Sequence, residues 1–428
     1  MPLITIIGGG LAGCEAAWQA ANRGVSVTLY DMKPNKKTPA HTNDNLGELV
    51  CSNSMRSDSL SNAVGLLKEE MRCLNSLIIQ CADATKIPAG GTLAVDREGF
   101  AAAITEKIKS HPNIKLILSD EIAEIPSGIV IIATGPLTSD VLLHSVRQLT
   151  GEKDLFFFDA AAPIVTYESI NMQKAYKASR YGKGGDDYIN CPMDEQQYNQ
   201  FWNSLINAQT APIKDFEQNV FEGCMPVEVL AKRGEKALLF GPLKPVGLRC
   251  PNGDMPHAVV QLRQDNSDAT LYNMVGFQTH LKFGEQKRVF SMIPGLENVE
   301  IVRYGVMHKN IFINSPSLLL PTYRFRNDER IFFAGQITGV EGYAESASSG
   351  LVAGINAAHA ALGREDVVFD IKTAIGALAD YISAAKTENF QPMNINFGLL
   401  PPLDVKIKQK QQRNEAISQR SLNILKKA

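Results

Sequence analysis

No stretch of this sequence is long and apolar enough to cross a membrane, because no apolar run approaches the roughly eighteen residues that a helical span requires. An excess of charge of one sign is also lacking, since 43 Lys and Arg against 45 Asp and Glu give a net charge of −2. Whole-chain charge therefore gives no indication of nucleic-acid binding, and an RNA site would have to be a local patch. The N-terminus begins with a strand-like run instead of a signal peptide. We expect a cytoplasmic protein with neither a membrane nor DNA as a partner.

Paired cysteines and metal-ligand clusters are lacking as well. The seven cysteines are an odd number, are scattered along the chain and form no C-x-x-C pair. This pattern indicates neither a disulfide framework nor a zinc site, and we expect no bound metal. What the chain does have is length: 428 residues with 44% apolar content exceed what one core usually supports. We therefore expect two domains.

Residues 3–34 have the pattern of a strand, a glycine turn, a helix and a second strand. Gly8, Gly10 and Gly13 stand at the G-x-G-x-x-G spacing directly after an apolar run. In such a turn the first glycine permits the bend, the second lets the backbone approach a pyrophosphate, and the third lets the helix pack on its strand. Asp31 ends the second strand, where a carboxylate can accept hydrogen bonds from a ribose. A bare glycine triplet indicates only a tight turn, but the complete unit predicts a dinucleotide site formed by Gly8, Gly9, Gly10, Leu11, Ala12, Gly13 and Asp31.

The pattern of an apolar strand that ends in a glycine recurs further along the chain. Residues 128–136 contain an apolar run ending in Gly135, and residues 330–361 contain a strand ending in Gly335 and then a long helix of small residues. A second glycine-terminated strand followed by a helix is what two-dinucleotide-type flavoproteins add for the flavin half, so FAD is favoured over NAD alone. The small residues have a plainer explanation, close helix packing, and both explanations can hold. Gly135, Gly335 and Gln336 complete the expected cofactor site.

Between these parts, residues 163–304 have aromatics, prolines and glycines at short intervals and no clear βα alternation. The one convincing helix there, residues 194–207, begins at an N-cap aspartate. We interpret this region as an insertion. The expected fold class is α/β, a Rossmann-like two-dinucleotide-type FAD-binding domain interrupted by a smaller α+β insertion domain. The expected bounds are 1–162 for the first part, 163–304 for the insertion, and 305–428 for the second part with its tail.

Two cysteines are distinguished by their surroundings. Cys51 and Cys224 each lie in a polar stretch rich in Gly or Ser, and a turn places a thiol at a surface. Nearby cations, Arg56 for the first and Lys232 or Arg233 for the second, could lower the thiol pKa. An inert small hydrophobe is the usual role of a free cysteine, and we expect it for the cysteines in helical patterns, Cys14, Cys73 and Cys81.

The C-terminal segment is locally basic. Residues 403–428 contain seven Lys and Arg against two Asp and Glu, a local charge of +5 in a chain whose net charge is negative. A solvated basic helix would have this composition, but phosphate binding also requires such a patch. The candidate RNA-binding residues are Lys406, Lys408, Lys410 and Arg413.

Several long motifs resemble the folate- and FAD-dependent tRNA (uracil-5-)-methyltransferases, the TrmFO family. They include TPAHTNDNLGELVCSNSMRSD, GGTLAVDREGF, SRYGKGGDDYINCPM, GQITGVEGYAESASSG and FQPMNINFGLLPP, and the similarity runs from end to end. The resemblance implies methyl transfer to uridine 54 in the tRNA T loop. Methylenetetrahydrofolate would donate the carbon, reduced FAD the electrons, and NADPH or NADH would reduce the flavin, although no second complete glycine fingerprint is present.

The resemblance also implies roles for three residues. Cys224 matches the reactive cysteine expected to add to uracil C6, and Cys51 matches a second reactive cysteine near the flavin. His308, in the motif RYGVMHKN, is expected to stack on the folate, whereas a lone histidine is more often a hydrogen-bonded structural residue.

Other functions remain open from the sequence. A paralogous branch methylating ribosomal RNA would keep the same chemistry, and no motif separates the two RNA classes. A flavin oxidoreductase of a small metabolite would have no use for a basic tail. A flavoprotein scaffold without catalysis would not need both Cys51 and Cys224.

Overall fold

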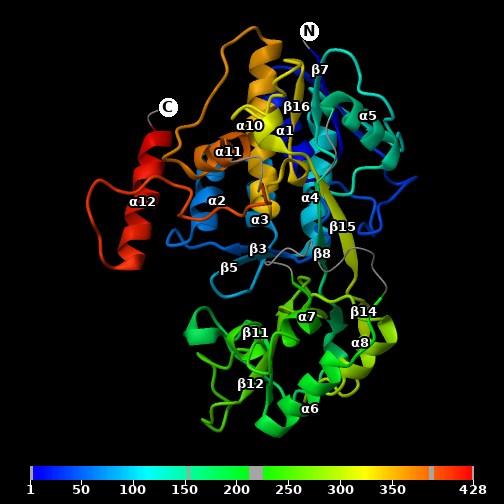
Figure 1. The fold of residues 1–428 in the computed structure, drawn as a ribbon, viewed down its shortest axis with the longest axis vertical. Helices are drawn as coiled ribbons and strands as arrows, with labels where there is room; N and C mark the ends of the chain where they lie inside the picture. The colour runs from blue at the N-terminus through cyan, green and yellow to red at the C-terminus, as the bar shows by residue number, and fades with distance from the viewer. Residues whose placement is uncertain (1–2, 152–154, 212–224, 385–389, 427–428) are drawn as a thin grey trace.

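The computed structural model describes residues 3–151, 155–211, 225–384 and 390–426. Figure 1 shows two bodies, an upper one containing both ends of the chain and a lower one formed by its middle. Each body has its own hydrophobic core. The larger core draws on residues from both the first and the last third of the chain, so the upper body is completed only after the chain has returned from the lower one.

The upper body is built on a five-stranded sheet of order β16-β7-β1-β2-β6. Every neighbouring pair in it is parallel. Its strands are short and apolar, as expected for a sheet covered by helices, and β1 buries Ile4, Ile6 and Ile7. The expectation of an α/β fold with a parallel sheet is confirmed. The strands are β1 (Leu3–Ile7), β2 (Ser26–Asp31), β6 (Ile114–Leu118), β7 (Ile129–Ile132) and β16 (Ile331–Phe333).

Two helices from opposite ends of the sequence pack directly on each other. Gly350 and Gly354 of α10 lie so close to α1 that an added Cβ would come within 2.1 Å of the Ala12 oxygen and 2.6 Å of the Ala16 oxygen. The small residues of this segment therefore do permit close helix packing. The helices of the upper body are α1 (Leu11–Asn22), α2 (Ala63–Cys73), α3 (Leu77–Ala84), α4 (Arg97–Ser110), α5 (Asp140–Thr150), α9 (Ser315–Leu318), α10 (Tyr343–Ala361), α11 (Ala374–Ala384) and α12 (Lys410–Leu425).

The lower body contains a six-stranded sheet of order β10-β11-β12-β13-β9-β14, antiparallel throughout. Helix α6 begins at Asp194, whose side chain forms a capping box with Gln197. We propose the insertion bounds 163–304 on this strand pairing. The elements are β9 (Ile164–Thr166), β10 (Tyr176–Lys177), β11 (Tyr188–Met193), α6 (Glu195–Ile206), α7 (Val227–Ala231), β12 (Ala258–Gln264), β13 (Leu271–Met274), α8 (Phe283–Phe290) and β14 (Ile301–Arg303).

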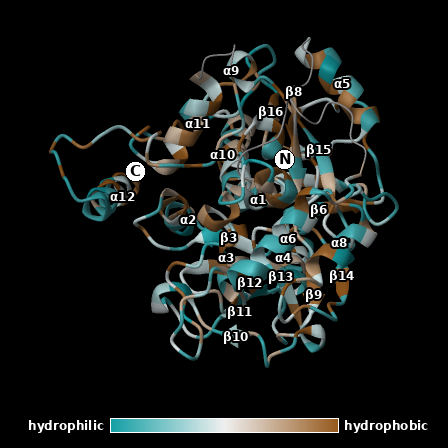
Figure 2. Ribbon diagram, turned by 60° about the horizontal axis from the view of Figure 1, so that its bottom comes forward, coloured by the Kyte–Doolittle hydropathy of each residue, from teal (hydrophilic) through white to brown (hydrophobic). Residues whose placement is uncertain are grey.

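Two antiparallel strands, β8 (Leu155–Ala160) and β15 (Met307–Phe312), carry the chain between the bodies. A small antiparallel sheet of β3 (Ser54–Ser57), β5 (Thr92–Val95) and β4 (Lys86–Ile87) lies at the lower edge of the upper body. The junction is therefore formed by β8, β15 and the segments beside this small sheet. Figure 2 shows α12 set to one side of the molecule, with mostly hydrophilic residues.

A buried carboxylate holds the C-terminal helices in place. Glu70 of α2 accepts hydrogen bonds from the amides of Ala374 at 2.7 Å and Ile375 at 2.8 Å, at the start of α11, and from the hydroxyl of Ser421 on α12. Burial raises the pKa of Glu70 to about 7, although these hydrogen bonds act to lower it. Three helices distant in sequence thus share one titratable group.

We predict that the destabilisation caused by Glu70→Gln shrinks as pH rises from about 4.5 to 7. A carboxyl group whose pKa is raised in the folded state stabilises fully below its unfolded pKa, and this contribution is lost as pH rises through the folded pKa. Glutamine does not titrate. The difference in unfolding free energy between wild type and Glu70→Gln therefore varies with pH only through the ionisation of Glu70. Urea unfolding of both proteins at pH 5 and pH 7.5 measures it, and a difference that stays constant or grows contradicts the raised pKa.

Candidate functional site

The first glycine turn connects β1 to α1 at the carboxyl edge of the parallel sheet. Gly8 adopts φ +107°, which favours glycine, and its amide donates to the Tyr30 oxygen at 2.8 Å. A Cβ on Gly13 would lie 1.8 Å from the Gly8 oxygen, so only glycine permits this approach of helix to strand. A Cβ on Gly10 would meet nothing within 4 Å. The turn therefore packs tightly against the helix at Gly13 and leaves free space beside Gly10.

The turn offers amide donors to an anion. Helix α1 begins after Gly10, and no side chain in the described part of the chain caps its first amides. Asp31 accepts a hydrogen bond from the Gly9 amide at 2.8 Å through one carboxylate oxygen, and from the Lys33 amide at 2.8 Å through the other. Asp31 therefore holds the turn in shape, a role in addition to the ribose contact expected from the sequence.

A cavity opens in front of this turn and encloses about 1140 Å³ of empty space, including its open mouth. Its walls come from three glycine-ended strands, β1, β7 and β16, and from the start of α10. Ten of the residues expected to hold a cofactor line this cavity or pack directly beneath its floor: Gly8, Gly9, Gly10, Leu11, Ala12, Gly13, Asp31, Gly135, Gly335 and Gln336.

Cys51 lies between this cavity and the lower body. Its amide and that of Ser52 donate to the hydroxyl of Tyr343, at 2.8 and 3.1 Å, and Tyr343 lines the cavity. The Cys51 thiol lies 3.7 Å from the Ala160 oxygen at the end of β8. The thiol is thus placed where the cavity, the connecting strand and the first residues of the insertion meet.

The expected lowering of the Cys51 pKa by Arg56 is wrong. Arg56 instead pairs with the buried carboxylate of Glu345. Burial raises the pKa of Cys51 to about 12, and the nearby charge of Asp159 acts in the same direction, while Arg97 acts to lower it. The resting thiol is therefore protonated at neutral pH.

Two buried arginines, Arg97 and Arg263, and the partly buried Arg303 tie the segment around Cys51 to both bodies. Arg97 of α4 pairs with Asp265 at 2.9 Å, and Arg263 of β12 donates to the Asn53 side chain at 3.0 Å. Arg303 of β14 donates to the Val50 oxygen at 2.7 Å. Because two of these arginines belong to the lower body, the geometry at Cys51 depends on how the two bodies meet.

His308 lies on β15 opposite Asp159 of β8. Burial lowers the pKa of His308 to about 4, and the charges of Arg303 and His41 act in the same direction, so the ring is neutral at pH 7. Its Nε2 atom is buried and has no hydrogen-bond partner among the described residues. A neutral imidazole at the junction has the flat apolar faces that stacking requires, whereas a hydrogen-bonded structural histidine would have both nitrogens engaged.

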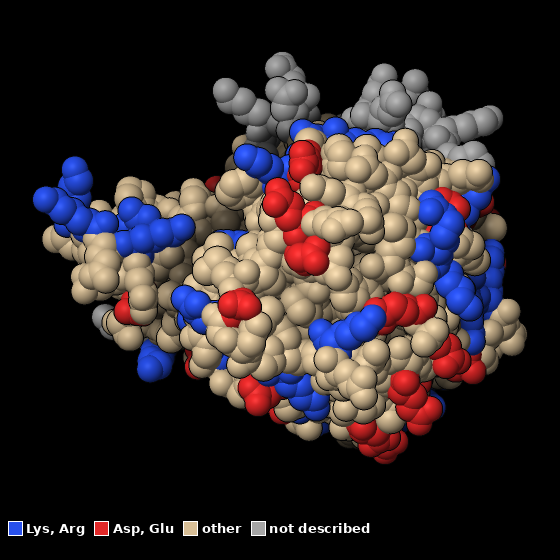
Figure 3. Space-filling model, turned by 90° about the horizontal axis from the view of Figure 1, so that it is seen from below, with Lys and Arg blue, Asp and Glu red and all other residues tan. Residues whose placement is uncertain are grey.

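The basic tail presents its charges to solvent. Lys406, Lys408, Lys410 and Arg413 are all exposed, and the last two lie at the start of α12. The opposite side of α12 is anchored, since Ser418 donates to the Leu60 oxygen at 2.7 Å. Figure 3 shows Lys and Arg atoms gathered on the projecting lobe at the left, where α12 lies. The tail is an anchored helix with an exposed basic end.

Comparisons with known proteins decide the family. The family model described as Glucose inhibited division protein A matches residues 3–365. A Bacillus subtilis protein named Methylenetetrahydrofolate--tRNA-(uracil-5-)-methyltransferase TrmFO is 60% identical over 424 residues, covering 99% of this chain and 97% of the relative. An Acetivibrio thermocellus protein of the same name is 62% identical over 426 residues, covering 99% and 98%. The chain belongs to the TrmFO family.

The solved structure of Aquifex aeolicus GidA shows the same fold as this TrmFO-family chain. In its form II crystal it superposes with a TM-score of 0.72, covering 99% of this chain and 73% of the GidA chain. The two share 17% sequence identity, so the likeness establishes the fold and not the activity. It extends beyond the parallel sheet, because nearly all of the present chain is covered.

The structure does not test the expectation for Cys224, and it differs from the helical cysteines' expected environment at Cys73. Cys224 lies outside the described residues, so its proposed role rests on the motif alone. Cys14 and Cys81 are buried, which suits the expected role of an inert small hydrophobe, whereas Cys73 is exposed at the end of α2. Helical spacing alone did not identify the face on which Cys73 lies.

Sequence reasoning missed several residues of the TrmFO-family site. Tyr343 supports the Cys51 segment, and Arg97, Arg263 and Arg303 hold it between the bodies. Tyr343, Arg97 and Arg303 lie in motifs that the sequence analysis associated with the family, but the contacts that these side chains make at the Cys51 segment span up to 292 positions of the chain. Such contacts have no local sequence signal.

Among the described residues, no helix is long and apolar enough to cross a membrane. Within the same residues, no group of three or more His, Cys, Asp and Glu side chains could hold a metal ion.

Proposed function

We propose that this chain is a folate- and FAD-dependent methyltransferase that forms 5-methyluridine at position 54 of the tRNA T loop. One observation carries the proposal: Cys51 is held by Tyr343 at the edge of a glycine-lined cavity, directly beside the insertion. A thiol in that place can reach both a flavin bound in the cavity and an RNA base presented at the junction. The relatives at about 60% identity carry the name of this activity over nearly the whole chain.

The cavity suits FAD. The free amides at the start of α1 and the open position at Gly10 suit the pyrophosphate, and Asp31 can accept from a ribose hydroxyl while it holds the Gly9 amide. Gly135, Gly335 and Gln336 also line the cavity, and we place the flavin half beside them. When bound and reduced, FAD would supply the two electrons that convert a methylene carbon to a methyl group. NADPH or NADH is the proposed reductant.

The reaction needs a nucleophile because uracil C5 alone is a poor one. We assign this role to Cys224, whose thiolate would form a bond to uracil C6 and push the ring electrons to C5, which attacks the folate-derived carbon. Loss of the C5 proton would then break the bond between the methylene carbon and its folate carrier, which leaves as tetrahydrofolate. Hydride addition to that methylene carbon, with both electrons from reduced FAD, would form the methyl group, break the C6–S bond and return the thiolate. Cys51 is unsuited to the first step in its resting state, since its pKa is raised to about 12. Its proposed place is on the flavin side, in handling the one-carbon adduct or a proton.

His308 is the proposed stacking partner of the folate. Its pKa, lowered to about 4, keeps the ring uncharged, and β15 places it at the junction near Arg303. Lys406, Lys408, Lys410 and Arg413 are proposed to bind tRNA phosphates. Because tRNA is the proposed substrate, we propose the cytoplasm as the site of action.

Nucleoside mass spectrometry of tRNA and ribosomal RNA from cells lacking this gene tests the target. The proposal predicts that 5-methyluridine disappears from the tRNA T loop and remains unchanged in ribosomal RNA. Loss confined to ribosomal RNA would instead support the paralogous function, and loss from neither RNA would contradict both.

A further inference from the structure

The lower body carries a stacked pair of aromatic rings, one of which is exposed. Phe283, the first residue of α8, leaves 55% of its surface exposed. Its ring stacks on Tyr304, which follows β14, with centroids 4.7 Å apart and planes inclined by 28°. Burying a phenylalanine side chain stabilises a protein by roughly 1.5–3 kcal/mol. A ring that remains largely exposed gains only part of this stabilisation.

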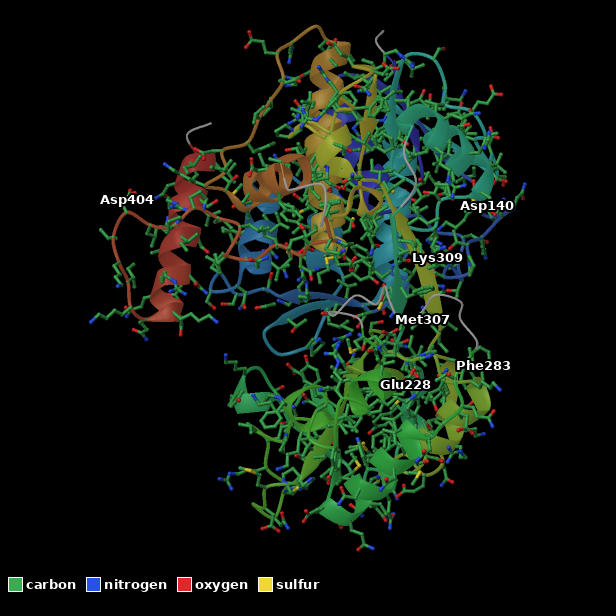
Figure 4. The ribbon with its side chains drawn as sticks, in the orientation of Figure 1. Asp140, Glu228, Phe283, Met307, Lys309 and Asp404 are labelled. Atoms are coloured by element: carbon green, nitrogen blue, oxygen red, sulfur yellow. The ribbon has the colours of Figure 1, made fainter. Side chains whose placement is uncertain are left out.

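The pair lies beside the junction. Gly305, the residue after Tyr304, donates to the Gln286 side chain at 2.8 Å, and the next residue, Val306, accepts from the Ala161 amide at 2.8 Å. Ala161 follows Ala160, whose oxygen lies against the Cys51 thiol. Figure 4 shows Phe283 at the edge of the lower body, with Met307 of β15 above it at the junction. A short series of backbone contacts thus connects Tyr304 to the strand end that lies against Cys51.

Exposed lysines lie close to the two rings in the sequence. Lys282 precedes Phe283, Lys287 lies one helical turn further on, and Lys309 follows on β15, all three exposed. Lys309 also places its ammonium 3.8 Å from the centre of the Phe156 ring. The acidic residue in this stretch, Glu285, is paired with Arg288 at 2.7 Å. The surface therefore combines an exposed aromatic ring with exposed lysines.

We propose that Phe283 and Tyr304 form a stacking platform for an unpaired base of the RNA substrate, next to the target uridine. The proposal rests on the proposed function, since a uridine modified at C5 has to leave its stack and its neighbours lose their partners. An aromatic face accepts any base, and the surrounding lysines suit the phosphates on either side. Exposed lysines beside an aromatic ring complement the phosphates and the base of a nucleotide together, so the combination favours RNA.

Phe283→Ala is expected to raise the Kd of the full FAD-loaded enzyme for a tRNA transcript by about 5- to 150-fold. The salt dependence should stay the same, because a stacked ring releases no counterions. Phe283→Trp should restore affinity, which separates stacking from a general effect on α8. A T-arm hairpin with 2-aminopurine beside the target uridine should show fluorescence quenching on binding wild type and not on binding Phe283→Ala.

Two comparisons make the result specific. Phe240→Ala removes another exposed aromatic of the lower body, 83% exposed, and should leave Kd and quenching unchanged. Replacing Lys406, Lys408 and Lys410 together with glutamine should weaken binding and reduce the salt slope by about 0.7–0.9 for each phosphate that the tail no longer neutralises. A Phe283→Ala Kd within twofold of wild type, or an equal loss in Phe240→Ala, overturns the platform. If wild type transfers no folate-derived methyl group to the same tRNA, the proposed function fails independently of these Kd values.

Discussion

Cys224→Ala is expected to abolish methyl transfer and, with it, every covalent link between enzyme and RNA. A thiolate that adds to uracil C6 forms a bond to the RNA, and fluorine at C5 blocks the proton loss that would release it. Wild type incubated with folate, reductant and a tRNA containing 5-fluorouridine at the target position should therefore yield a complex that survives a denaturing gel. Cys224→Ala should lose this band and reduce turnover by on the order of 10³-fold or more, with its flavin spectrum unchanged.

Cys51→Ala provides the matched comparison. It should also lose methylation, but because Cys51 is proposed to act on the flavin side, its variant should still form the RNA adduct. The flavin content of both variants serves as the control for folding. A gel on which the band survives Cys224→Ala and disappears in Cys51→Ala would show that the nucleophile has been assigned to the wrong cysteine.

Gly10→Val is expected to fold and to lose most of its FAD. Gly10 has an ordinary φ of −76° and, its chain neighbours aside, nothing within 4 Å of the position of an added Cβ, so a Cβ there neither strains the backbone nor clashes with the rest of the protein. The same empty position is where a pyrophosphate would approach the turn, and a branched side chain there occupies its place. Flavin absorbance per mole of purified protein measures the loss.

Gly91→Val is the control for Gly10→Val. Gly91 likewise has no atom within 4 Å of an added Cβ, and it does not line the cavity, so its variant should retain full flavin content. Gly13→Val, by contrast, should fail to fold properly, because its side chain would meet the Gly8 oxygen. Unchanged flavin content in a folded Gly10→Val protein would remove the glycine turn from the cofactor site.

The parallel sheet and the glycine turn could be predicted because their signals are local. The apolar run of β1, the spacing of Gly8, Gly10 and Gly13, and Asp31 at the end of β2 all lie within one short βαβ unit. Steric constraints within such a unit act between neighbours in sequence, so spacing alone specifies them.

The environment of Cys51 could not be predicted in the same way. Its neighbouring polar residues indicated a surface turn, whereas segments from other parts of the chain bury the thiol and raise its pKa. The cations that bear on it, Arg97 and Arg303, come from α4 and from β14, not from the adjacent Arg56. Electrostatics at a junction depends on tertiary contacts, which one sequence does not reveal.

The sequence analysis did not identify the stacked pair of Phe283 and Tyr304, because their stacking is also a tertiary contact. In the sequence Phe283 belongs to an ordinary amphipathic pattern, and only the fold stacks Tyr304 against it and leaves much of its surface exposed. The basic tail, in contrast, was visible from composition because its charges are close together in the chain. Whether a helical residue is buried depends on which face of its helix a neighbouring element covers, and helical spacing in the sequence does not reveal that face.

Isotope tracing distinguishes folate from other sources of the methyl carbon, and so tests whether folate supplies the carbon while FAD supplies the electrons. Purified enzyme would be given tRNA, a reductant and methylenetetrahydrofolate carrying ¹³C in its methylene group, with S-adenosylmethionine absent. We expect 5-methyluridine in the T loop with the label in its methyl group. Absence of the label from that methyl group, or a requirement for S-adenosylmethionine as the methyl source, would contradict the proposed chemistry.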